Sequence, residues 1–145
     1  MTETDKAYLA GFIDGEGSIG LRTTHTNRKP KYRSLCLRLR ITQCDRPILE
    51  WIKAVTGVGS VRQGSVQTDR HQERFGWSCA GQYALRVLHE VYPYLKLKRI
   101  QSEIAFEFEK TMLGSGKPLP EELHIKRQTL REAMDELHSH KHGGI

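Results

Sequence analysis

The chain lacks any long apolar run. No stretch reaches the roughly 18 consecutive apolar residues of a membrane helix, and no charged and then apolar leader opens the sequence. Cysteine is scarce too: there are 3, an odd number, without the C-x-x-C spacing of zinc or redox sites. These absences favour an intracellular protein with reduced thiols, in cytoplasm, nucleoid or organelle, that is not secreted and does not bind membranes.

Acidic residues are scarce where basic ones gather. Residues 18–43 hold seven basic side chains and no acidic one, whereas the whole chain has a net charge of +6 and a pI near 9.4. Residues 1–100 carry 17 Lys and Arg against 9 Asp and Glu, and residues 101–145 carry 6 against 8. Since a solvated surface usually mixes both signs, the imbalance favours a polyanionic partner such as nucleic acid.

The apolar residues follow two periods. In 18–43 they alternate with polar ones, as at Ile19 and Leu21 and again from Leu35 to Ile41, which predicts a hairpin with one apolar face. Helical spacing and turn residues predict the rest: a helix ending at Gly17, a second hairpin over 58–78, and helices over 45–55, 82–92 and 97–112. We therefore expect an α+β fold, αββαββα, with a four-stranded antiparallel sheet, helices on one face and C-terminal helices added.

The length fits one domain spanning 1–145. Residues 1–112 form its predicted core, and the Gly- and Pro-rich stretch 113–120 a linker. A C-terminal helix is predicted over 121–138. The histidine-rich tail 139–145 does not have the spacing of a tight zinc site, so we expect it to be disordered.

One stretch, Leu9 to Gly17, places two carboxylates and three glycines at a helix end. Gly11 and Gly15 are four residues apart and therefore share a face, where their lack of a side chain indicates a close approach by another backbone. A second copy of the helix would fit, and it would bring two Glu16 side chains together. Paired carboxylates are hard oxygen ligands that favour Mg²⁺ or a relative such as Mn²⁺.

This stretch resembles the LAGLIDADG motif of homing endonucleases, with Phe12, Gly15 and Glu16 in place of the consensus Leu, Ala and second Asp. The resemblance covers about the first hundred residues and implies that Glu16 is the metal-binding acid, aided by the Gly15 carbonyl. It also places Gln43 and Lys98 in the active site. An amide such as Gln43 can orient a water, and a compact cation such as Lys98 can stabilise transition-state charge.

Residues 17–145 contain no second copy of the motif, so the resemblance implies the single-motif, homodimeric type. Its dimer interface would include Tyr8, Gly11, Phe12 and Gly15. Each subunit would read half of a long, near-palindromic DNA target. The expected activity is a divalent-metal-dependent double-strand break that leaves 3′ overhangs. Asp14 could share in holding the metal, but its preferred interpretation is as a cap or brace of the helix end.

Basic and small polar residues on the polar face of the predicted sheet form the candidate DNA surface. A two-stranded ribbon fits the major groove, where Arg pairs bidentately with guanine. Residues near the first hairpin tip are expected to meet phosphates. The predicted DNA-binding set is Arg22, Thr24, Arg28, Lys29, Lys31, Arg33, Ser34, Cys36, Arg38, Arg40, Arg62 and Arg74.

Two alternatives use the same fold. An intron-encoded RNA maturase would bind its host intron RNA through another face and could have lost cleavage. A non-cleaving DNA-binding protein would need no metal ligand. The presence of Glu16, Gln43 and Lys98 together favours the nuclease.

Overall fold

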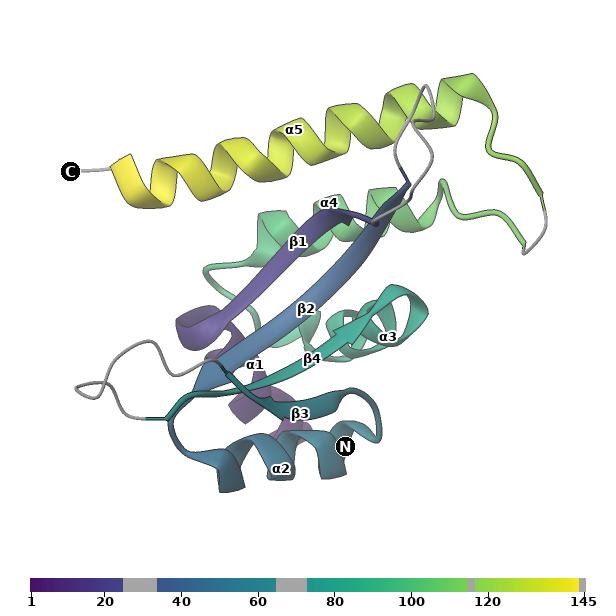
Figure 1. Ribbon diagram of the computed structural model, residues 1–145. Helices are drawn as coiled ribbons and strands as arrows, with labels where there is room; N and C mark the ends of the chain where they lie inside the picture. Colours follow the sequence, from purple (N-terminus) through teal and green to yellow (C-terminus); the bar gives the residue numbers. More distant parts are fainter. Residues whose placement is uncertain (25–33, 65–72, 115–116, 144–145) are drawn as a thin grey trace.

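The computed structural model describes residues 1–24, 34–64, 73–114 and 117–143. Its elements follow the order helix, hairpin, helix, hairpin, helices (Figure 1). Their bounds are α1 Glu3–Glu16, β1 Gly17–Thr23, β2 Leu35–Gln43, α2 Arg46–Thr56, β3 Ser60–Gln63, β4 Phe75–Ala80, α3 Gly81–Val91, the short 3₁₀ helix η1 Tyr92–Tyr94, α4 Arg99–Glu109 and α5 Glu121–Gly143.

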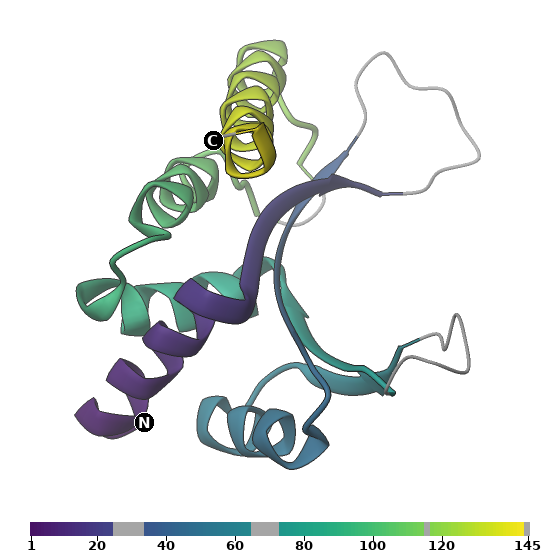
Figure 2. The same ribbon diagram turned by 90° about the vertical axis from the view of Figure 1, so that its left-hand side faces the viewer.

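The four strands form one antiparallel sheet in the order β1-β2-β4-β3. Within it Ile19 pairs with Leu39, and Leu39 pairs in turn with Cys79, so that residues of one parity share the core face. Figure 2 shows the sheet nearly edge-on and curved, with the helices on its convex side, at the left of the view. No helix of the described parts covers its concave face, which confirms the predicted α+β architecture.

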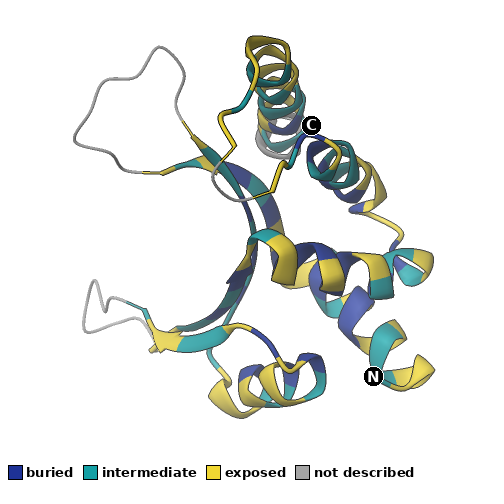
Figure 3. Cartoon of the chain, turned by 90° about the vertical axis from the view of Figure 1, so that its right-hand side faces the viewer, coloured by how far each residue is buried: buried dark blue, intermediate teal, exposed yellow. Residues whose placement is uncertain are grey.

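The core lies between the sheet and the helices, where Figure 3 shows the buried residues. Ile13 of α1, Leu39 of β2 and Leu88 of α3 are completely buried there, as is Trp77 of β4, whose indole Nε1–H donates to the Val58 carbonyl at 3.0 Å. Burying a Leu or Ile side chain contributes about 1.5–3 kcal/mol. This core fixes α1 against β2 and β1 and so fixes the direction in which its C-terminal end points.

Both ends of α1 are defined by local chemistry. Thr2 caps the helix in a capping box, because its hydroxyl accepts from the Asp5 N–H at 3.0 Å and the Asp5 carboxylate accepts from the Thr2 N–H. At the other end the chain passes directly into β1 through Gly17. A Cβ at that position would lie 2.8 Å from the Ile13 carbonyl oxygen, so only glycine fits the turn.

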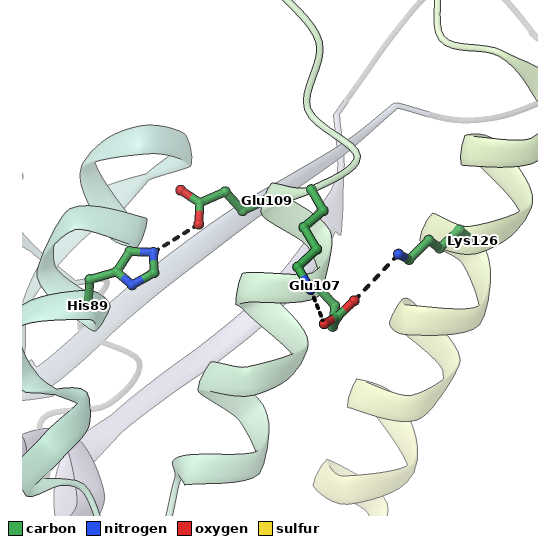
Figure 4. Close-up of polar contacts among 5 residues, drawn as sticks. His89, Glu107, Glu109 and Lys126 are labelled. Atoms are coloured by element: carbon green, nitrogen blue, oxygen red, sulfur yellow. Dashed lines mark hydrogen bonds and ion pairs between the residues drawn. The ribbon is translucent and has the colours of Figure 1, made fainter.

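The C-terminal helix is joined to the body by polar contacts (Figure 4). The imidazole of His89 on α3 lies 2.8 Å from Glu109 on α4, and the Lys126 ammonium on α5 lies 3.4 Å from Glu107 on α4. Farther along α5, the Nε2 of His138 lies 3.1 Å from the Ile19 carbonyl on the outer edge of β1. The contacts hold α5 along α4 and beside the first strand.

Two details correct the predicted elements. The last helix, predicted to end at 138, continues to Gly143, so the tail predicted as disordered over 139–145 is helical as far as 143. The histidines and Lys141 there are compatible with a helix, and glycine follows only at Gly143. Helix α4 ends at Glu109 rather than at 112 and buries Ser102, Ala105 and Phe108. Leu97 and Ile100, two apolar residues of the segment predicted as this helix, are exposed.

None of the helices in the described ranges combines the length and apolar character needed to cross a bilayer.

Candidate active site and nucleic-acid interface

One side of α1 is not covered by the described part of the chain. Gly11 and Gly15 are exposed on it, and a Cβ built on either glycine meets no described atom within 4 Å apart from its chain neighbours and the adjacent backbone of its own helix. Tyr8, on the same side, is 53% exposed and touches Phe12 and Trp51 with its ring. The described residues of the chain therefore give no packing reason for the two glycines, although each costs about 1 kcal/mol of helix propensity relative to alanine.

Glu16 ends α1 and lies beside this open side. A shallow pocket there is lined by Glu16 and by Gln43, which ends β2, together with Ala7, Tyr8, Gly11 and Phe12. The side-chain oxygen of Gln43 accepts the Cys44 N–H at 2.7 Å, which fixes the amide and leaves its NH₂ group as a donor. Two of the three predicted catalytic side chains, Glu16 and Gln43, thus share one pocket with three residues of the predicted dimer interface.

Lys98, the third predicted catalytic residue, is not a surface cation. It is only 6% exposed, and its ammonium donates to the main-chain oxygen of Asp14 at 2.7 Å. Asp14, Gly15 and Glu16 are consecutive residues, so the positive charge of Lys98 is held at the same end of α1 as the acid.

Asp14 does brace a helix, but the helix is α4 and not its own. Its carboxylate accepts the backbone N–H groups of Lys96, Leu97 and Lys98 at 2.9, 3.1 and 3.0 Å. These residues form the approach to α4, and Lys98 is its N-cap residue. Because both carboxylate oxygens are engaged by N–H groups, Asp14 is not directed at a metal in this arrangement.

The donor atoms at the end of α1 suit a hard cation. The Glu16 carboxylate and the Gly15 carbonyl supply oxygen, the ligand type of Mg²⁺ and Mn²⁺. However, no group of three or more His, Cys, Asp or Glu residues within the described chain could hold a metal ion. One chain therefore offers part of a ligand set, which a second Glu16 and the phosphate oxygens of a substrate would complete.

The concave face of the sheet carries the predicted arginines. Gly20 of β1 pairs with Arg38 of β2, Arg22 pairs with Cys36, and Arg62 of β3 pairs with Gly76 of β4. Burial, and after it the positive charges of Arg22, Arg40 and Arg62, lower the pKa of Arg38. In the described ranges no acidic side chain forms an ion pair with these four arginines. The face is therefore strongly electropositive.

The other predicted DNA-binding residues divide into two groups. Thr24 and Ser34 extend the first hairpin, joined by the Thr24 N–H and the Ser34 carbonyl at 3.0 Å, and Arg74 is exposed directly before β4. Arg28, Lys29, Lys31 and Arg33 fall outside the residues that the structure describes.

Gly76 is a functional candidate that the sequence did not single out. A Cβ at this residue would lie 3.3 Å from both Nε and one Nη of Arg40, so the guanidinium rests directly over the glycine backbone. A glycine in a strand interior is a general signal of close approach, but the approaching group is known only from the fold. Ser18, Thr42 and Ser78 also belong to this face, and strand alternation could have identified them.

We expect Gly76→Val to displace the Arg40 guanidinium and to weaken binding of duplex DNA by roughly tenfold, about the 1–3 kcal/mol of one bidentate base contact. β-Branched residues favour strands, so the fold should be retained. Fluorescence anisotropy with a cleavage-resistant target would measure the change. A Gly76→Val, Arg40→Ala double variant that binds no more weakly than Arg40→Ala would assign the loss to Arg40, whereas multiplying losses would contradict this cause.

A family model described as LAGLIDADG endonuclease matches residues 9–111 of the chain. Among curated protein sequences, none matches.

Three solved structures show the likeness of fold. Homing endonuclease I-CvuI, in complex with its target and in the presence of calcium, is 23% identical with a TM-score of 0.72, over 92% of this chain and 82% of that one. The archaeal intron-encoded I-Vdi141I, complexed with DNA, is 18% identical with a TM-score of 0.76, over 93% and 84%. I-SmaMI, bound to cleaved DNA, is 17% identical with a TM-score of 0.71, over 91% of this chain but only 44% of that one.

Proposed function

The chain belongs to the LAGLIDADG endonuclease family, and from this premise we propose that it is a homodimeric, site-specific homing endonuclease that cuts both strands of a long, near-palindromic DNA target. The observation that carries the proposal is the position of Glu16: it ends a helix whose open glycine side can receive a second copy, beside a basic, concave sheet.

The concave face supports duplex DNA as the substrate. Its arginines lie on paired strands, and a two-stranded ribbon fits the major groove, where guanidinium groups recognise guanine edges. DNA phosphates would stabilise the closely spaced positive charges of these arginines. The DNA affinity should therefore fall steeply as the salt concentration rises. I-CvuI and I-Vdi141I, which share this fold, are described in complex with DNA.

Three exposed features, two on α1 and one beside its end, support a homodimer. The glycine side is open, Tyr8 is half exposed beside it, and Leu97, whose N–H is bonded to Asp14, is 75% exposed next to the same helix end. The given sequence also carries a single copy of the motif. A twofold axis along the glycines would bring both Glu16 side chains to one shared site.

In the proposed reaction a water oxygen adds to the phosphorus and gives up a proton to the solvent, the bond to the leaving oxygen breaks, and that oxygen takes up a proton from the solvent. Glu16 and the Gly15 carbonyl of each subunit would hold Mg²⁺ or Mn²⁺, which supplies Lewis-acid stabilisation of the phosphoryl oxygens. The NH₂ group of Gln43 orients the water, and the Lys98 ammonium stabilises negative charge in the transition state. Staggered cuts would leave 3′ overhangs.

The test is cleavage of a randomised DNA-site library by the purified protein with Mg²⁺, Mn²⁺, Ca²⁺ or EDTA, followed by sequencing of the cut ends. We expect cuts at one pseudo-palindromic site, with 3′ overhangs, in Mg²⁺ or Mn²⁺ and none in EDTA. No cuts by a folded, DNA-binding dimer in any metal would overturn the nuclease. Tight binding to a structured intron RNA under those conditions would instead favour the maturase.

A further inference from the structure

The approach to α4 depends on a side chain from another part of the chain. The N-cap residue of α4, Lys98, makes no side-chain capping hydrogen bond, and no acidic residue stands in the first turn of the helix. Instead three consecutive N–H groups there donate hydrogen bonds to the Asp14 carboxylate. Asp14 lies more than 80 residues earlier in the chain. A negative charge is also favourable at a helix N-terminus that carries Lys96, Lys98 and Arg99.

The same residue meets Lys98 twice. Its carboxylate binds the Lys98 N–H at 3.0 Å and its main-chain oxygen accepts from the Lys98 ammonium at 2.7 Å. Hydrogen bonds to one residue of α1 therefore hold both the backbone and the ammonium group of Lys98. Gly15 and Glu16 follow immediately, so this arrangement sets the position of the cation relative to the proposed metal ligands.

We propose that Asp14 is a positioning residue for the reaction, which acts by holding Lys98 beside the acid of the motif. The part of this proposal that concerns catalysis rests on the proposed nuclease function. A carboxylate is required because Oδ1 accepts two N–H groups, from Leu97 and Lys98, and Oδ2 accepts the third, from Lys96. An asparagine has one acceptor oxygen, and its NH₂ group would face an N–H donor.

The kinetic test is a double-mutant cycle on the full-length dimer with Asp14→Asn, Lys98→Gln and the double variant. We expect Asp14→Asn to lower the single-turnover cleavage rate by roughly 10- to 100-fold, the range for loss of a group that orients an active-site residue. DNA affinity in Ca²⁺ should stay within about twofold. If Asp14 acts through Lys98, the double variant is no slower than Lys98→Gln, because interacting sites are not additive. Rate losses that multiply would overturn the proposal.

A second measurement does not depend on cleavage. Lys98 is nearly buried, so we expect it to react slowly with an acetylating reagent compared with Lys53, which is exposed on α2, as followed by mass spectrometry. Asp14→Asn should speed the acetylation of Lys98 several-fold and leave Lys53 unchanged. Unchanged Lys98 reactivity would refute positioning by Asp14, whether or not the wild-type protein cuts DNA.

A control variant separates the effect of general destabilisation on Lys98 from the specific effect of Asp14. Thr56→Val removes the hydroxyl that donates to the Ile52 carbonyl at 2.7 Å, at the buried end of α2 and away from the Asp14 contacts. It should lower the free energy of unfolding by about 1–3 kcal/mol through unsatisfied polar groups. Its Lys98 reactivity should equal that of the wild type. A rise in this control as large as in Asp14→Asn would show that loosened folding, and not Asp14, controls Lys98.

Discussion

Glu16→Gln is expected to lower the cleavage rate by roughly 10³-fold while DNA affinity in Ca²⁺ and the dimer are preserved. The amide keeps the shape of the side chain but removes the charge that would hold the metal, whose transition-state stabilisation is worth several kcal/mol. Glu16 is exposed at the end of α1, so folding should not depend on it, and the free energy of unfolding should stay within about 0.5 kcal/mol. Single-turnover cleavage of the selected target measures the rate.

Glu132→Gln is the matched control, because Glu132 is also an exposed acid, on α5. It should cleave as the wild type does. A titration with Mn²⁺ adds a second readout: Glu16→Gln should need a much higher metal concentration for its residual activity. If Glu16→Gln cut as fast as the wild type, Glu16 would not be the metal ligand. If it lost DNA binding in Ca²⁺ as well, its role would lie in assembly.

The fold could be predicted because its two hairpins obey a simple rule. Ile19 and Leu21 alternate with polar residues in β1, as do Leu37, Leu39 and Ile41 in β2, and the structure buries all five. A period of two assigns a face to each side chain without knowledge of tertiary contacts. The same rule places the arginines of these strands together on the opposite face.

The arrangement of the candidate site could be predicted only in part. The motif located Glu16 and the open glycines, since both lie within nine residues of sequence. The anchoring of Lys98 by Asp14 joins segments more than 80 residues apart, and no local pattern encodes such a contact. Similarly, the role of Gly76 is evident only from the fold, in which Arg40 of the neighbouring strand lies across it.

Helix α4 shows why helical spacing can mislead. Leu97 and Ile100 continue the apolar spacing of this segment but are exposed, while the small residues Ser102 and Ala105 are completely buried. The spacing of apolar residues predicts that a helix has an apolar face, but it does not predict which elements pack on that face. Because α3 and α5 both pack on α4, small residues are accommodated at the buried contacts, and the exposed leucine next to the motif helix remains available to a second copy.

Gly11→Leu should have opposite effects on the chain and on its assembly. Within one chain the new side chain meets open space, and leucine gains up to about 1 kcal/mol of helix propensity over glycine. Across a dimer that closes on the glycines it would collide with the partner backbone. An overpacking cost of about 3 kcal/mol would raise the dissociation constant of the dimer roughly 100-fold. Sedimentation velocity over a concentration series measures this change.

The cleavage rate should fall in parallel, because each subunit supplies one Glu16. It should recover as the protein concentration is raised. Gln128→Leu adds the same apolar side chain at an exposed position of α5 and should leave the dimer intact. If Gly11→Leu dimerised as tightly as the wild type, the glycine side of α1 would not be the interface. The two Glu16 side chains would then not meet there, and the shared metal site would have to be assembled along another surface.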